Sequence, residues 1–184
     1  MKFVMLLLVA TSIAARAEIN LTPTASVRVL DGCSFPQLEF HDEGKTITYE
    51  PPAGWSYASG GKNALTLRPK NKVQADAKIE VAASPLPLQF DPENLKVLQA
   101  RVTASLPAQS EKIEVAEPLV DSLKIGGRST CEFELTYVRF GQKYKVSILF
   151  VDLEKAQLTF TLSCLSADYE ELHKQFRGSW FSWQ

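Results

Sequence analysis

The sequence predicts an antiparallel β-sheet covered by helices, in an α+β or sandwich arrangement. Two observations favour this fold. Residues 128–165 contain three successive runs in which apolar and polar side chains alternate, with short turns between them, as in an antiparallel meander. Two helix-like segments, beginning near residues 91 and 168, are separated by strand-like runs and do not alternate with strands one for one.

The first strand of the meander has two chemically different faces. The apolar face consists of Cys131, Phe133, Leu135 and Tyr137. The polar face consists of Glu132, Glu134 and Thr136. Strands near 143–150 and 158–164 repeat the alternation after short turns. We therefore expect the three strands to share one apolar face, and we expect Glu132 and Glu134 to lie on a solvated face.

The segment after the meander predicts a C-terminal helix packed on that apolar face. Asp168 and Glu171 have the spacing of a capping box. An apolar stripe follows at helical spacing: Tyr169, Leu172 and Phe176. Gly178 is placed to end the helix.

The N-terminal part of the chain is less regular. Residues 18–44 predict an irregular N-terminal segment, in which only 25–30 resemble a short strand. A strand at 45–50 precedes the Pro51–Pro52 break, because proline does not continue a strand ladder.

The middle of the chain contains further strands and a second helix. Return strands are expected at 64–67 and 78–83. Asp91 as N-cap and Pro92 at the first helical position predict a helix before Pro107. No repeat or linker divides the chain, so residues 45–184 are expected to form a single α+β domain.

Residues 1–17 have the pattern of a signal peptide. Lys2 precedes an apolar run over 3–10, and Ala15 and Ala17 are small residues at the positions that a signal peptidase reads. The run is shorter than the roughly 20 apolar residues that a membrane-spanning helix needs, so no transmembrane segment is expected. The sequence thus predicts export, with a periplasmic or extracellular location after cleavage near Ala17.

Charge and residue pattern argue against several functions. The formal net charge is −1 and no long basic cluster occurs, so a nucleic-acid partner is not expected. The two histidines, His41 and His173, lack the spacing of a metal or cofactor site. A Cys164–His173 catalytic pair is the weakest alternative, because a histidine at the edge of a helix stripe is more often structural. The chain is therefore predicted to be non-enzymatic, without a metal or cofactor.

The three cysteines leave the disulfide pattern open. Cys131 and Cys164 fall at opposite ends of the expected meander, too far apart to bridge. The remaining alternatives are a Cys33–Cys131 disulfide, a Cys33–Cys164 disulfide, or three unpaired cysteines that behave as small apolar residues.

Four features along residues 40–184 resemble the PsbP-like superfamily. They are a strand followed by Pro-Pro-x-Gly-Trp over 46–55, Phe90-Asp91-Pro92-Glu93 opening a helix, Gly126-Gly127-Arg128 before a long strand, and Phe176 with Trp180-x-x-Trp183 near the end. The resemblance is to a small exported bacterial member, with 45–184 as the PsbP-like domain. It implies an α/β/α sandwich and a non-catalytic, protein-binding role.

The leading functional prediction is an exported, non-enzymatic protein-interaction or scaffold module of the cell envelope, binding another envelope or secreted protein. Large aromatic residues are common at binding hot spots, and four are the candidate partner-binding residues: Trp55, Trp180, Phe181 and Trp183. The alternative is a small-molecule or lipid carrier with an apolar pocket between sheet and helix. That pocket would lie among Tyr144, Phe150, Phe160 and Phe176.

Overall fold

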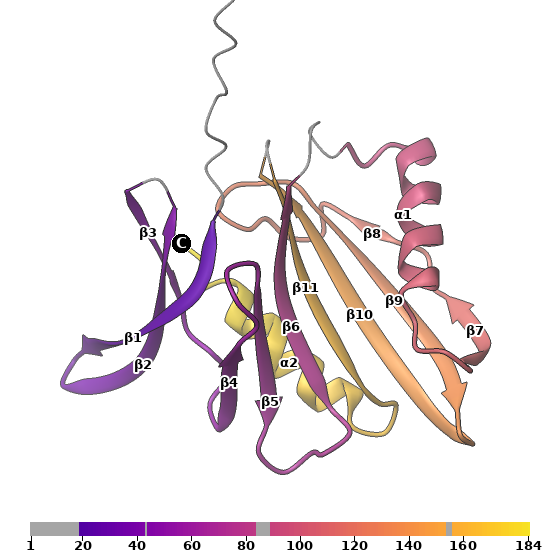
Figure 1. Cartoon of the computed structure of the whole chain (residues 1–184), viewed down its shortest axis with the longest axis horizontal. Helices are drawn as coiled ribbons and strands as arrows, with labels where there is room; N and C mark the ends of the chain where they lie inside the picture. The colour runs from indigo at the N-terminus through magenta and orange to yellow at the C-terminus, as the bar shows by residue number, and fades with distance from the viewer. Residues whose placement is uncertain (1–18, 43, 84–88, 154–155) are drawn as a thin grey trace, which may run out of the picture.

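A computed structural model describes residues 19–184 apart from 43, 84–88 and 154–155 (Figure 1). The predicted signal peptide, residues 1–17, lies outside the described residues. The predicted α+β fold is confirmed, with two β-sheets and a helix on each face of the larger one. Neither helix is long and apolar enough to cross a membrane in the part of the chain that the structure describes.

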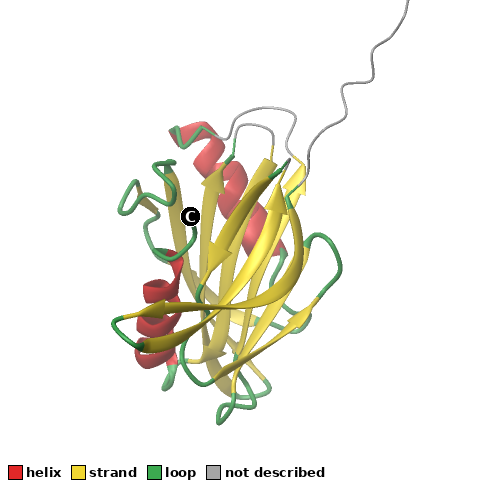
Figure 2. Ribbon diagram, turned by 90° about the vertical axis from the view of Figure 1, so that its left-hand side faces the viewer, coloured by secondary structure: helices red, strands yellow, loops and turns green. Residues whose placement is uncertain are grey.

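The larger sheet has eight antiparallel strands. Its order is β4 (Trp55–Ser59), β5 (Ala64–Pro69), β6 (Asp76–Ala83), β11 (Ala156–Leu165), β10 (Gln142–Asp152), β9 (Thr130–Arg139) and β7 (Glu111–Val115), and β8 (Leu119–Val120) also pairs with β9. The smaller sheet has the order β1 (Asn20–Leu30), β2 (Cys33–Asp42) and β3 (Lys45–Tyr49). In Figure 2 the long hairpin of the smaller sheet crosses the strands of the larger one.

The two helices cover opposite faces of the larger sheet. Helix α1 (Pro92–Ala104) buries Leu98 and Val102 against the face of β9 and β10 that carries Phe133 and Phe150. Helix α2 (Tyr169–Trp180) packs on the other face, against Phe160 of β11 among others. The apolar face of β9 that was expected beneath the C-terminal helix is therefore covered by α1 instead.

The meander does not share one apolar face. Phe160 pairs with Leu149, not Phe150, so the apolar residues of β11 point to the α2 side. Strand β10 is buried on both sides from Val146 to Val151 and serves both cores. The predicted carrier pocket is consequently wrong, because Phe150 and Phe160 lie on opposite faces.

Most of the segment expected to be irregular forms two long strands, since β1 and β2 together span residues 20–42. Asp31 and Gly32, with φ of 50° and 78°, make the two-residue turn that joins β1 to β2. Pro23 lies within the irregular register between Asn20 and Thr24, and Pro36 precedes the part of β2 that pairs with β3. Both prolines thus occupy positions that strands tolerate, and they do not break the hairpin.

The smaller sheet belongs to the same core as the C-terminal end of the chain. Leu21, Phe40 and Tyr49 are fully buried in one cluster with Trp183. Backbone hydrogen bonds of 2.8 and 3.2 Å join Thr48 and Gln184. A domain boundary between residues 44 and 45 is therefore not a structural division, because β3 completes a sheet begun by β1 and β2.

The helix ends agree with the sequence in one case and differ in the other. Asp91 caps α1 as predicted, accepting hydrogen bonds from the backbone N–H groups of Glu93 (3.0 Å) and Asn94 (2.9 Å). The Asp168 side chain makes no capping bond and instead accepts one from Lys72 Nζ at 2.6 Å. The predicted capping box is absent at α2, and the helix continues through Gly178 to Trp180.

Candidate functional site

The predicted aromatic partner-binding residues are mostly in the core. Trp180, Trp183 and Trp55 are 0%, 6% and 8% exposed. Trp183 stacks on Phe40 with ring centroids 5.5 Å apart, and Trp55 stacks on Phe176 at 5.9 Å. The prediction is corrected for the three tryptophans, since buried packing already uses them; Phe181, 60% exposed, is still available to a partner.

A second apolar surface lies on the outer part of the β1–β2 hairpin, residues 26–36, which we call the hairpin arm. Four large apolar side chains of the arm are exposed: Val27, Val29, Leu30 and Phe35. Their exposed fractions are 61%, 67%, 51% and 38%. Figure 1 shows the hairpin extending away from the larger sheet. This surface was not predicted, because residues 18–44 were expected to be irregular and no hairpin was expected here.

Register gives the hairpin arm two apolar faces. Val27 pairs with Pro36 and Val29 with Ser34 on one face, while Leu30 pairs with Cys33 and Phe35 with Arg28 on the other. Strand β3 pairs with β2 only from Leu38 onward, so within the described residues the arm is a two-stranded ribbon. Such a ribbon presents backbone edges and apolar side chains together.

One ion pair links the hairpin arm to the residue that follows β3. Arg28 donates to both carboxylate oxygens of Glu50, from Nε at 2.5 Å and from Nη2 at 3.2 Å. The same guanidinium lies 5.1 Å from the centroid of the Phe35 ring. Both side chains of the ion pair are partly exposed, so it links the arm to Glu50 with only a modest stabilisation.

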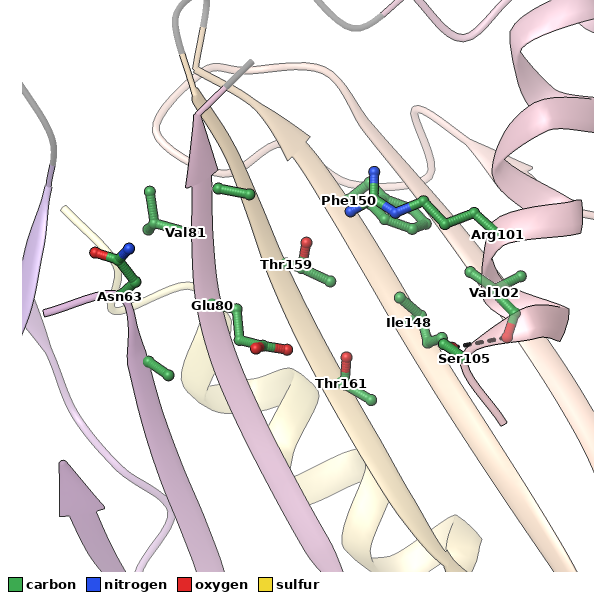
Figure 3. Close-up of a pocket in the computed structure, with 12 residues that line it drawn as sticks. Asn63, Glu80, Val81, Arg101, Val102, Ser105, Ile148, Phe150, Thr159 and Thr161 are labelled. Atoms are coloured by element: carbon green, nitrogen blue, oxygen red, sulfur yellow. Dashed lines mark hydrogen bonds between the residues drawn. The ribbon is translucent and has the colours of Figure 1, made fainter. Parts of the chain in front are cut away.

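A groove runs beside α1, over the open half of the larger sheet (Figure 3). Its volume is about 270 Å³. The lining comes from α1 and from strands β5, β6, β10 and β11: Asn63, Ala64, Glu80, Val81, Ala82, Arg101, Val102, Ser105, Ile148, Phe150, Thr159 and Thr161. The groove marks the line where the sheet face changes from apolar to polar.

Arg101 is the cationic group of the groove. Its guanidinium carbon lies 5.6 Å from the centroid of the Phe150 ring, and Nη1 donates to Gln157 Oε1 at 2.7 Å. Gln157 is 4% exposed, and its Nε2 has no hydrogen-bond partner among the described residues. Gln157 does not line the groove, so Arg101 is the group that would bind an oxygen-bearing ligand there.

A buried polar cluster lies on the other face of the sheet, beneath α2. Glu132 is 1% exposed, and its Oε1 accepts a hydrogen bond from Ser147 at 2.7 Å and lies 2.8 Å from His173 Nε2. Burial raises the pKa of the Glu132 carboxyl, but the His173 and Ser147 contacts and the charge of Arg177 outweigh burial, so its net pKa is below the usual value.

Glu134 extends this cluster. It accepts hydrogen bonds from Tyr169 at 2.7 Å and from Lys145 Nζ, 2.9 Å away. Burial raises its pKa, and these contacts reverse that effect and bring the net pKa below its usual value. The prediction of a solvated face is therefore wrong for Glu132 and only partly right for Glu134, whose side chain is 27% exposed. The sequence does contain a signal for this burial. Residues 148–151 of β10 form an unbroken apolar run, which indicates a sheet covered on both faces.

The cysteines are all free thiols in the structure. Cys33 is exposed on the hairpin arm, whereas Cys131 and Cys164 are buried on opposite faces of the sheet. Neither alternative disulfide involving Cys33 is formed. Burial raises the pKa of Cys164 to about 11, which keeps the thiol protonated near neutral pH.

No family model matches this sequence, and no curated protein matches it. Among solved structures, the fold is similar to LpqN of Mycobacterium tuberculosis, described as involved in cell envelope biogenesis. The TM-score is 0.50 at 15% identity, over 86% of this chain and 87% of LpqN. This likeness shows a shared fold.

Two further structures are more distant. PA94 of Pseudomonas aeruginosa, described as a putative regulator of unknown function, has a TM-score of 0.44 at 13% identity over 85% of this chain and 94% of PA94. A protein of Bacteroides thetaiotaomicron VPI-5482 has a TM-score of 0.46 at 8% identity over 70% of this chain, which spans 42% of that protein. None of the three is described as PsbP-like, so that resemblance stays a prediction.

Proposed function

We propose that this protein is an exported, non-enzymatic interaction module of the cell envelope that binds another envelope or secreted protein through the hairpin arm. The observation that carries the proposal is the arm itself, which exposes four large apolar side chains within nine residues, 27–35. Exposed apolar side chains are normal singly, but here each face of a projecting two-stranded element carries two of them, which favours an interaction surface on the arm.

Two further observations support this function. LpqN, which shares the fold, is involved in cell envelope biogenesis, and residues 1–17 have the pattern of an export signal. The raised pKa of Cys164 and the engagement of His173 with Glu132 argue against a Cys–His nucleophile. The arm therefore supplies binding chemistry, and the proposal assigns no reaction to the chain.

Site-specific photo-crosslinking in the cells that produce the protein tests the proposal. A photo-reactive residue at Val29, on the arm, is expected to form a discrete crosslink to another envelope protein. The same residue at Val97 of α1 is the matched control, since that position is 66% exposed and far from the arm in sequence. Equal crosslinking from both positions, or none from Val29, contradicts the proposal.

The groove beside α1 supports a second candidate, a small-ligand carrier. Arg101, the cationic side chain in the groove wall, favours an oxygen-bearing ligand. The volume of about 270 Å³ lies just below the roughly 300–1,000 Å³ of typical ligand pockets, which makes this the weaker candidate. Native mass spectrometry of the purified protein tests it: excess mass that disappears in Arg101→Ala supports a carrier, and a bare chain contradicts one.

A further inference from the structure

We propose that Glu132, Glu134 and His173 form a binding site for a divalent transition-metal ion, with zinc as the best match. Glu132 and Glu134 are two residues apart on β9 and therefore share a face, and His173 reaches the same point from α2. One ligand atom from each residue can be chosen so that all lie within 4.8 Å of one another. The site lies on the opposite face of the sheet from the groove and is separate from the hairpin arm.

An unpartnered oxygen is the second observation that points to a cation. The Glu132 carboxylate is 1% exposed, and both hydrogen-bond contacts go to Oε1. Among the described residues Oε2 has no hydrogen-bond partner, and it makes only a long ion-pair contact with Arg177 Nε, 3.9 Å away. An unsatisfied buried carboxylate oxygen is costly, so a metal ion at this oxygen would remove a real deficit.

The donor set suits zinc. One imidazole nitrogen and two carboxylate oxygens are common zinc ligands, and such three-residue sites leave the fourth position to water. The outer contacts also fit, since ligating carboxylates are usually hydrogen-bonded by a second group. Ser147 donates to Glu132 and Tyr169 donates to Glu134, which holds both carboxylates toward His173.

Solvent reaches the site along α2. The His173 side chain is 12% exposed and lines a surface groove of about 710 Å³ with Lys174, Arg177 and Phe181. An ion can enter from this side without opening the core between α2 and β11.

Two cationic side chains, Lys145 and Arg177, compete with the metal for the carboxylates. The nearer of them, Lys145, also has a second carboxylate within reach. Lys145 Nζ lies 2.9 Å from Glu134 and 3.7 Å from Glu170, whose side chain is 88% exposed. We therefore expect metal binding to transfer Lys145 from Glu134 to Glu170. Arg177 is 35% exposed and can turn toward solvent.

Metal titration of the purified, chelator-treated protein tests this inference. Isothermal titration with zinc chloride is expected to give one saturable site, and cobalt(II) is expected to give the intense visible bands of a tetrahedral complex. His173→Gln and Glu132→Gln should weaken zinc binding by about 100-fold or more, since each removes a ligand. His41→Gln is the matched control, because it removes the other histidine of the chain, which is exposed.

A variant that removes a competing positive charge tests the inference even if the variants that remove a metal ligand fail to fold. Lys145→Met removes a positive charge next to the site and should tighten zinc binding by roughly tenfold. Absence of a saturable zinc isotherm in the wild type, a purely octahedral cobalt spectrum, or equal losses in His41→Gln and His173→Gln would overturn the inference. Weaker binding by Lys145→Met would do the same.

Discussion

The two faces of the larger sheet change from apolar to polar in opposite directions. On the α1 face, one row of paired residues runs Thr66, Lys78, Thr161, Ile148 and Phe133, and only its apolar end lies under the helix. On the α2 face, the matching row runs Leu65, Ile79, Phe160, Leu149 and Glu132, and the helix covers its polar end as well.

The difference lies in what each helix does at the polar end of its row. Helix α1 leaves Thr66 and Thr161 partly exposed, so solvent can reach them and the face stays open beside a groove. Helix α2 buries Glu132, so protein groups must satisfy the carboxylate, and His173 and Ser147 do so in part. Polar residues on a sheet are thus a solvated surface or a specific site, depending on whether the helix above them extends that far.

The α2 face is expected to be the more sensitive to truncation of a large side chain. Trp180 is fully buried against Phe160 and Phe176, with ring centroids 5.7 and 5.5 Å away. Trp180→Ala should lower the free energy of unfolding by about 3–5 kcal/mol, because it leaves a large cavity. Urea denaturation followed by circular dichroism measures this, and a loss below about 1 kcal/mol would contradict the packing described.

The α1 face should lose less on a comparable change. Leu98 is 3% exposed, but Leu98 and Val102 are the only two residues of α1 that are buried. Leu98→Ala is expected to cost about 2–3 kcal/mol, at the low end for a buried leucine, because a lightly anchored helix can settle into the space. The same urea experiment compares the two variants, and a larger loss for Leu98→Ala than for Trp180→Ala would reverse the comparison.

Thiol labelling sharpens the comparison without a mutation. Cys33 is exposed, Cys131 lies in the core beneath α1, and Cys164 lies in the core beneath α2. Native labelling with iodoacetamide near pH 8 should modify Cys33 first, then Cys131, then Cys164, since the less anchored helix opens at a lower free energy. Peptide mass spectrometry over time gives the three rates; equal rates at Cys131 and Cys164 would show that both faces open together.

The smallest effect concerns the helix starts. The hydrogen bond from the backbone N–H of Asn94 lowers the pKa of the Asp91 carboxyl, and desolvation raises it by less. The net pKa is therefore below its ordinary value of 3.8. The pKa of Asp91 is thus lower in the folded state than in the unfolded state. The cap therefore stabilises the folded protein fully at pH values above the unfolded-state pKa, and this stabilisation is lost as the pH falls through the folded-state pKa. Asp91→Ala should therefore lower the urea midpoint at pH 7 and have little effect near pH 2.

Asp168 provides the matched control for that prediction. Its side chain makes no capping bond, so Asp168→Ala removes only the ion pair with Lys72, which added salt screens. A midpoint shift for Asp168→Ala at pH 7 that equals or exceeds the shift for Asp91→Ala would contradict the assignment of Asp91 as the functioning cap.

Local signals predict the elements of this fold well. The Asp91–Pro92 start of α1 and the alternation in β9, β10 and β11 are written in neighbouring residues, and the structure contains each of them. The N-terminal hairpin is less predictable, because Pro23 and Pro36 resemble breaks until the register shows that the ladder does not need their missing donors.

The assignment of faces depends on longer-range information. Period-two alternation in β9 and in β11 does not reveal that their apolar residues point to opposite sides, since this depends on the pairing register through β10. The burial of Glu132 therefore escapes a strand-by-strand reading, as does its contact with His173, 41 positions away. The exposed hairpin arm is missed for the related reason that exposure depends on where β3 stops.

The contacts between the smaller sheet and the C-terminal part of the chain have a consequence for folding during synthesis. Tyr49 hydrogen-bonds to Ser179 across 130 positions, and the Glu50 backbone N–H donates to Ser182 across 132. Contacts of such sequence separation form slowly, because the intervening loop must close first. During synthesis the smaller sheet therefore cannot complete its core with Trp183 until α2 and the residues after it have left the ribosome.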